Sequence, residues 1–123
     1  MSRTVRSLAA LALVVAIPAT AWGVRFHNHL VKSAPLTGET VAAPKTITLW
    51  FAEKPELPAS TIALLAADSS TIATGKLSAP AGETNAIATT VDKALAAGTY
   101  TVQWKTAGSD GHPARGKYSF TVK

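Results

Sequence analysis

The chain has 123 residues, enough for one compact domain and too few for two. It has no cysteine, which excludes disulfides, a thiolate nucleophile and any cysteine-ligated zinc or blue-copper centre. The formal net charge is +5, but the basic residues are scattered and form no block, so nucleic-acid binding is not indicated.

The first 21 residues have the features of a secretory signal peptide. Arg3 and Arg6 supply a positive start, a short apolar run follows, and small residues end the segment. The apolar run is shorter than the roughly 20 residues of a membrane-spanning helix. We therefore predict export to the periplasm or another extracytoplasmic space. Cleavage is expected after residue 21, with 23 and 26 as alternatives; an uncleaved membrane anchor is the rival interpretation.

The remainder, residues 27–123, is predicted to form one strand-rich domain. Thr, Val, Ile and Ala predominate there, and Gly, Pro, Ser and Asp divide them into short runs. Apolar and polar residues alternate most clearly in 100–104 and 118–122, which is typical of strands with one buried face. The predicted strands are His29–Ser33, Thr46–Phe51, Thr61–Ala66, Thr71–Leu77, Ala86–Thr90, Thr99–Thr106 and Gly116–Val122.

Seven short strands separated by turns predict an all-β fold, an antiparallel sandwich. The composition of Val91–Ala97 favours a helix, although the segment is long enough for little more than a single turn. Asp68–Ser70 is predicted to be the tip of a hairpin. Trp50 and Trp104 lie in hydrophobic runs, so we expect both in the core.

Four residues with metal-binding side chains come from three separate places in the chain. His27 begins the sequence H-N-H-L and Glu53 ends the run L-W-F-A-E. Asp110 and His112 lie in S-D-G-H-P, between two predicted strands. Two imidazoles and two carboxylates form a nitrogen and oxygen donor set without sulfur, which favours Cu(II), with Zn(II) and Ni(II) as competitors.

Each motif also has a simpler interpretation when it is taken alone. S-D-G-H-P is a composition typical of polar turns, the two early histidines suit a solvated terminus, and Glu53 suits a solvated rim. If the loop backbone is extended, Asp110 and His112 point to the same side. On a strand, His27 and His29 would likewise share a face, which makes His29 an auxiliary candidate ligand.

Three segments resemble a known family in order and spacing. They are H-N-H-L-V-K-S-A-P-L-T-G (27–38), I-T-L-W-F-A-E (47–53) and A-G-T-Y-T-V-Q-W-K-T-A-G-S-D-G-H-P-A-R-G-K-Y-S-F-T-V (97–122). The last is the most specific, because it joins a Gly-Thr-Tyr strand start, a Trp, an S-D-x-H-P loop and a Gly-x-x-x-Phe strand. Together they resemble the CopC family of periplasmic copper-resistance proteins. Residues 57–96 match only as strand-like sequence.

The resemblance implies a Greek-key β-sandwich of the cupredoxin or immunoglobulin-like type, with one Cu(II) ion near the mature N-terminus. It implies that the ligands are His27, Glu53, Asp110 and His112. In the family the N-terminal histidine also binds through its α-amino group, which here requires cleavage directly before His27. Cleavage after residue 21 or 23, the better sites, would leave extra residues before His27. Only side chains would then bind the copper ion. The single methionine is Met1, so a Cu(I) thioether site is excluded.

The predicted function is therefore sequestration or delivery of Cu(II) in copper homeostasis or resistance, by a monomer without enzymatic activity. The resemblance implies an inner-membrane copper transporter of the CopD type as a partner. The alternative is an exported, non-catalytic accessory or interaction module without a physiological metal. Oxidative polysaccharide cleavage is not favoured, because the chain lacks an extended aromatic face. Copper affinity is expected to fall below about pH 6, because imidazole must be neutral to bind.

Overall fold

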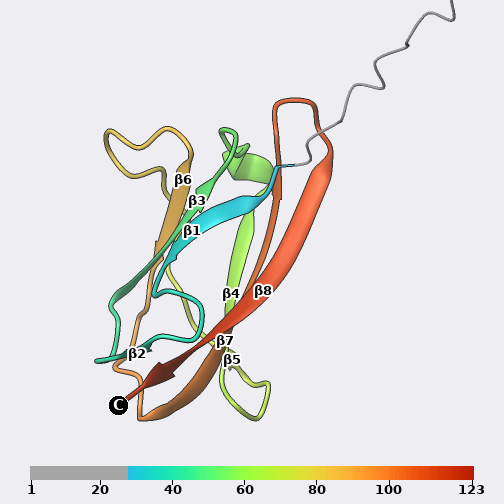
Figure 1. Ribbon diagram of the computed structural model, residues 1–123. Helices are drawn as coiled ribbons and strands as arrows, with labels where there is room; N and C mark the ends of the chain where they lie inside the picture. Colours follow the sequence, from blue (N-terminus) through green and yellow to red (C-terminus); the bar gives the residue numbers. More distant parts are fainter. Residues whose placement is uncertain (1–27) are drawn as a thin grey trace, which may run out of the picture.

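The computed structural model describes residues 28–123, which form two β-sheets packed face to face (Figure 1). The predicted signal segment 1–21 and His27 lie outside the described residues. The elements are β1 (Leu30–Ala34), β2 (Thr40–Val41), β3 (Thr46–Phe51), the short 3-10 helix η1 (Leu57–Ala59), β4 (Thr61–Leu65), β5 (Thr71–Ile72), β6 (Ala86–Thr90), β7 (Gly98–Ala107) and β8 (Pro113–Val122).

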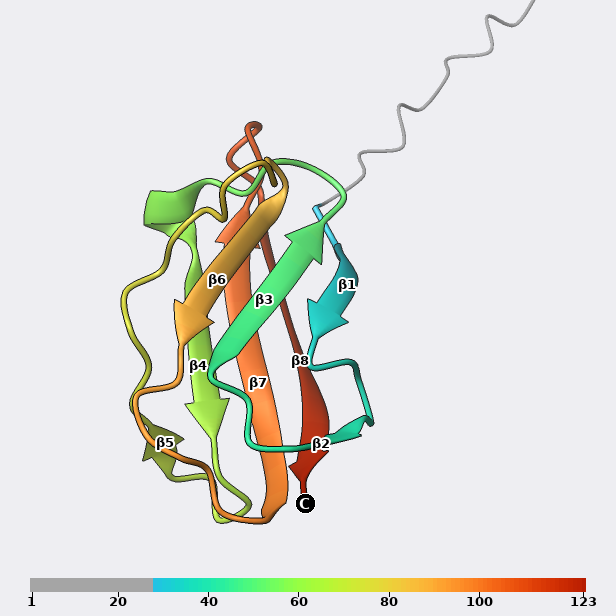
Figure 2. The ribbon, with the colours of Figure 1, turned by 90° about the vertical axis from the view of Figure 1, so that its left-hand side faces the viewer.

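The three-stranded sheet has the order β1-β3-β6, and the five-stranded sheet has the order β2-β8-β7-β4-β5. The chain passes from one sheet to the other after β1, β2, β3, β5 and β6, as Figure 2 shows. The predicted all-β, Greek-key sandwich is therefore confirmed. Within residues 28–123 no helix has the length and hydrophobicity needed to cross a membrane.

The core lies between the sheets and is built from alternate residues of the long strands. The tightest contact joins Trp104 to Phe51, whose rings meet edge to face with centroids 5.2 Å apart. Gly116 pairs with Trp104 across β7 and β8, and a Cβ at this glycine would lie 2.5 Å from the indole. The indole can therefore lie against the backbone of β8. The principal core residues are Ile47, Leu49, Phe51, Ile62, Leu64, Ile87, Tyr100, Val102, Trp104, Tyr118, Phe120 and Val122.

The core prediction for Trp50 is wrong, whereas that for Trp104 is confirmed. Trp50 is half-buried on the outer face of β3, where the Lys32 ammonium lies 4.7 Å from its ring centroid. Its indole N–H donates a hydrogen bond to the Glu83 carboxylate. The alternation of β3 explains this, because Ile47, Leu49 and Phe51 take the inward positions and leave residue 50 outside.

All seven predicted strands are present, but some bounds differ and β2 was not predicted. β2 pairs in parallel with the end of β8 over only two residues, too few for a periodic pattern. The strand expected over Thr71–Leu77 is β5, and it ends at Ile72. Beyond it, two isolated bridges join Thr74 to Val91 and Ser78 to Ala88 as the chain leaves the five-stranded sheet. The predicted hairpin tip is confirmed, because Asp68 accepts a hydrogen bond from the backbone N–H of Ser70 between β4 and β5.

The helical turn expected in Val91–Ala97 is absent from the structure, so that prediction is wrong. Leu95 is buried in the core, and the Tyr100 hydroxyl donates a 2.7 Å hydrogen bond to the carbonyl of Ala96. A segment of seven residues gains little from helix propensity, because helix nucleation is costly. Burial of Leu95 in an irregular connection therefore determines the local structure.

Burial raises the pKa of Tyr118 to about 12, from an ordinary value of 10.0. The Ser33 hydroxyl partly offsets this shift, although no group in residues 28–123 forms a well-aligned hydrogen bond with the Tyr118 hydroxyl. The folded chain thus holds this proton more tightly than the unfolded chain does. We expect the free energy of unfolding to be unaffected by this group below pH 10 and to fall as the pH rises from 10 to about 12. Urea unfolding across this range should show a smaller decline for Tyr118→Phe, and an equal decline in both proteins would contradict the assignment.

Candidate metal centre at the β7–β8 turn

The β7–β8 hairpin carries the S-D-G-H-P loop at one end of the sandwich (Figure 1). The two strands pair without interruption from Gly98 opposite Val122 to Ala107 opposite Pro113. The turn is closed by a 2.9 Å hydrogen bond from the backbone N–H of Gly111 to the carbonyl of Gly108. Gly111 has φ +76, a left-handed conformation that glycine adopts without strain.

Asp110 and His112 are brought together by this turn. The backbone N–H of His112 donates to Oδ1 of Asp110 at 3.0 Å, and Nδ1 of the ring lies 2.9 Å from Oδ2. The backbone is not extended here, because the chain bends at Gly111, yet the two side chains are in contact. In the tautomer with its proton on Nδ1, His112 donates to Asp110, and Nε2 then carries the lone pair. A carboxylate on one ring nitrogen is the usual way to orient a metal-binding histidine.

Glu53 reaches the same turn from the end of β3. A Cβ placed on Gly108 would lie 2.9 Å from Oε2 of Glu53 and 3.4 Å from Oδ1 of Asp110. The two carboxylates therefore approach one point from two different segments, and a residue without a side chain leaves them room. Carboxylate oxygens are among the donors that divalent metal ions accept, so both groups are candidate ligands.

Asn28 fixes the start of the described chain to Glu53. Its side-chain amide donates to the carbonyl of Glu53 at 3.1 Å and accepts from the N–H of Glu53 at 2.9 Å. Asn28 is only 4% exposed, and the ladder continues where the N–H of Ala52 donates to the carbonyl of His29. The residue that directly follows His27 in the sequence is thus held beside Glu53. The sequence analysis missed this role, because a single asparagine between two histidines gives no periodic signal.

The candidate ligands divide into three groups. Asp110 and His112 are in contact, and Glu53 lies next to Asp110. His29 is exposed, and its ring forms no hydrogen bond or ion pair with another residue of 28–123. His27 is outside the described residues, and within residues 28–123 no three His, Asp or Glu side chains form a metal-binding cluster.

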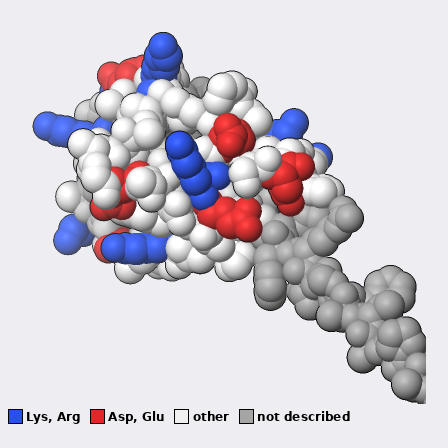
Figure 3. Space-filling model, turned by 90° about the horizontal axis from the view of Figure 1, so that it is seen from above, with Lys and Arg blue, Asp and Glu red and all other residues white. Residues whose placement is uncertain are grey.

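Acidic side chains gather at this end of the molecule (Figure 3). Glu53 and Glu56 lie between β3 and η1, Glu83 precedes β6, and Asp110 is in the turn. A 2.9 Å hydrogen bond from the N–H of Glu56 to the carbonyl of Ala107 ties the first of these loops to the end of β7. Clustered negative charge raises the local concentration of cations. The end that carries the candidate ligands therefore attracts positive ions.

Comparison with known families and proteins identifies relatives along nearly the whole chain. Residues 30–123 match the model of the CopC domain. Copper resistance protein C of Xanthomonas campestris pv. juglandis is 33% identical over 123 residues, covering 96% of this chain and 97% of that protein. Protein YobA of Escherichia coli K12 is 31% identical over 124 residues, with all of both chains covered.

Solved structures share the fold. The crystal structure of CopC from Methylosinus trichosporium OB3b matches with a TM-score of 0.72 and 32% identity, covering 79% of this chain and 94% of that one. PcoC from Escherichia coli, described as a methionine-rich copper resistance protein, matches with a TM-score of 0.71 and 35% identity, covering 80% of this chain and 100% of that one. This chain contains a single methionine, so it does not share that richness.

Proposed function

The chain belongs to the CopC family, and from that premise we propose that it binds one Cu(II) ion at the β7–β8 turn and sequesters or delivers it. The observation that carries the proposal is the contact between Asp110 and His112, with the Glu53 carboxylate directly beside it. Nitrogen and oxygen donors without sulfur suit Cu(II) rather than Cu(I). Relatives named for copper resistance support the identity of the metal.

The proposed ligands are His27, Glu53, Asp110 and His112, with His29 as an auxiliary. Asp110 is in position to accept a hydrogen bond from Nδ1–H of His112, which would direct Nε2, the other ring nitrogen, toward the ion. The two hydrogen bonds between the Asn28 side chain and the backbone of Glu53, which we call the Asn28 clamp, support His27 as a ligand. They hold the residue that follows His27 beside Glu53. The carboxylates offset the charge of the ion, and the acidic end of the sandwich draws it in.

We further propose that residues 1–21 are a cleaved signal and that the monomeric domain acts in the periplasm or an equivalent compartment. The positive start and short apolar run support export. Cleavage directly before His27 would add an α-amino ligand, whereas after earlier cleavage only side chains would bind the ion. The proposed role is binding without catalysis, with an inner-membrane copper transporter of the CopD type as the partner. An accessory module without a physiological metal is the competing function.

Titration of the secreted protein with Cu(II) tests the proposal. We expect one equivalent to bind, with a d–d absorption band and nitrogen hyperfine structure in the EPR spectrum. Zn(II) should compete less effectively at equal concentration, as expected from the general order of metal affinities. Intact-mass measurement of the same sample identifies the first residue and so the number of nitrogen donors available. Copper binding no tighter than that of a peptide of scrambled sequence would leave the accessory module as the function.

A further inference from the structure

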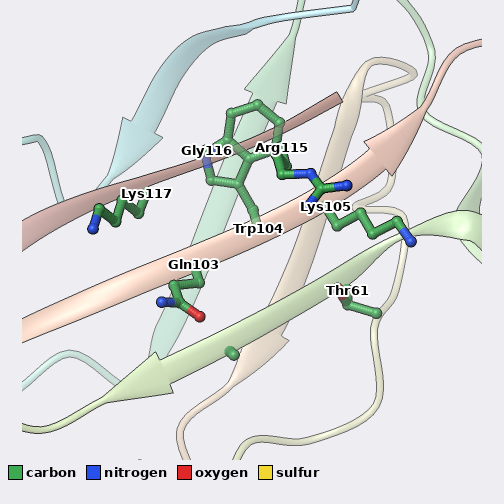
Figure 4. Close-up of a pocket in the computed structure, with 8 residues that line it drawn as sticks. Thr61, Gln103, Trp104, Lys105, Arg115, Gly116 and Lys117 are labelled. Carbon is green, nitrogen blue, oxygen red and sulfur yellow. The ribbon is translucent and has the colours of Figure 1, made fainter. Parts of the chain in front are cut away.

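The outer face of the five-stranded sheet carries three cations that the copper site does not use. Lys105 of β7 and Arg115 and Lys117 of β8 line a shallow hollow of about 500 Å³, and the rest of the lining is Thr61, Ala63, Gln103, Trp104 and Gly116 (Figure 4). All three cationic side chains are exposed, and Figure 4 shows Lys105 and Arg115 extending side by side from neighbouring strands. We call the six outward-facing residues, Thr61, Ala63, Gln103, Lys105, Arg115 and Lys117, the basic face.

The register places like charges opposite each other on this face. Lys105 is the direct partner of Arg115, and Lys117 is paired with Gln103 on the same side of the sheet. Directly opposed like charges on adjacent antiparallel strands destabilise a sheet. A contribution to the stability of the fold therefore does not explain why these cations lie opposite each other.

No carboxylate offsets this repulsion within the described part of the chain. The outward positions of β4, β7 and β8 hold no Asp or Glu, and none of the three cations forms an ion pair there. Four of the seven acidic residues lie in the loops at the end of the sandwich that carries the β7–β8 turn, and the other three are Glu39, Asp68 and Asp92 in other loops. The three cations of the basic face therefore have no carboxylate beside them on the outward positions of their own strands.

We propose that the basic face is a docking surface for an acidic segment of a partner protein. Lys105 and Arg115 lie two residue pairs from the last pair of the β7–β8 ladder, about 7 Å along the strands. A segment bound there would lie next to the turn that bears Asp110 and His112. The polar groups of Thr61 and Gln103 add hydrogen-bonding capacity between the cations.

The chemistry of the face favours a protein over other anionic partners. Membrane docking needs apolar side chains that enter the lipid boundary, whereas the apolar side chains of the hollow are Ala63 and Trp104, and Trp104 is only 8% exposed. The large exposed hydrophobic residues in residues 28–123 are Val31, Leu36 and Leu57, none of which lines this hollow. The cations are spread over an open surface, which suits several carboxylates of an extended segment rather than one small anion. Electrostatic complementarity of this kind determines partner choice and association rate.

The docking surface does not depend on the proposed function. Only the further idea that the docked partner exchanges copper with this chain rests on the proposed function. A partner on the basic face is adjacent to the turn, so transfer of the ion requires no large movement of this chain. Loss of copper binding at the turn would refute the proposed function and leave the docking surface intact. Loss of acidic-peptide binding would refute the docking surface and leave the proposed function intact.

Fluorescence anisotropy with a labelled oligoglutamate peptide tests the surface. We expect the intact domain to bind the peptide at low salt and to release it as ionic strength rises from about 0.01 M to about 0.1 M, where the Debye length falls from about 30 Å to about 10 Å. The triple variant Lys105→Gln/Arg115→Gln/Lys117→Gln should bind at least about tenfold more weakly. Its melting temperature should be equal to or above that of the parent, because like-charge repulsion is removed.

A matched triple variant, Lys45→Gln/Lys93→Gln/Lys123→Gln, removes the same charge from other places on the domain and should retain peptide binding. Equal losses in the two triple variants would mean that net charge alone attracts the peptide, which overturns the proposal. Binding to phosphatidylglycerol vesicles without binding to the peptide would overturn it in favour of a lipid surface. The Cu(II) titration should be unchanged in the basic-face variant.

Discussion

Replacing His112 with alanine is expected to weaken Cu(II) binding by more than about 100-fold, since even outer groups of metal sites are worth 10- to 100-fold. The variant removes an imidazole that the structure holds at 2.9 Å from the Asp110 carboxylate. It should fold normally, because His112 lies in an exposed turn outside the core. Competition titration against a copper chelator of known affinity measures the loss, and EPR should show fewer coupled nitrogens.

The matched control is His29→Ala, which removes the same side chain from an exposed position outside the turn. It should change copper affinity by no more than a few-fold. Asp110→Asn separates two roles of the carboxylate: if it is mainly an oxygen ligand, affinity falls while the number of coupled nitrogens is retained, and if it mainly orients the ring, the coupling to the His112 nitrogen is also weakened or lost. Equal affinity losses for the variants at positions 29 and 112 would refute the assignment of the site to the β7–β8 turn.

The fold was predictable wherever side chains alternate over several residues. β7 and β8 each place apolar residues at every second position, and Ala86–Thr90 was predicted with its observed bounds. β2 was missed because its two residues are ordered by parallel pairing with β8, a contact that local sequence does not encode. Val91–Ala97 was misassigned because tertiary burial of Leu95 outweighs the helix propensity of its neighbours.

The candidate site was predictable in residue type but not in construction. Metal-capable side chains together with the family resemblance indicated His27, Glu53, Asp110 and His112. The structure brings the last three to one end of the sandwich, and His27 lies outside the described residues. The two residues that arrange them carry no metal-binding group. Gly108 matters because it has no side chain, and Asn28 matters through bonds to the backbone of a residue 25 positions away. Such roles depend on tertiary contacts, so a single sequence gives no signal for them.

Replacing Asn28 with alanine is expected to destabilise the domain by about 1–3 kcal/mol, because it leaves the N–H and the carbonyl of Glu53 without their partners. The same change should weaken copper binding by about tenfold, the lower end of the range for outer groups of metal sites. The physical reason is that these two hydrogen bonds hold Asn28, the residue after the proposed ligand His27, beside Glu53. Urea unfolding and competition titration measure the two effects separately.

Asn85→Ala is the matched control. Asn85 is half-buried, and its side chain donates a 3.2 Å hydrogen bond to the carbonyl of Ala52, so it also supports the loop after β3. It does not touch the first residues of the domain, and its removal should leave copper affinity close to that of the parent. If Asn28→Ala loses stability but keeps full copper affinity, the clamp supports only the fold, and a ligand at position 27 does not depend on it. A loss of affinity with broadened EPR hyperfine lines would instead identify Asn28 as a positioning residue, since a ligand that is no longer held samples several geometries around the ion.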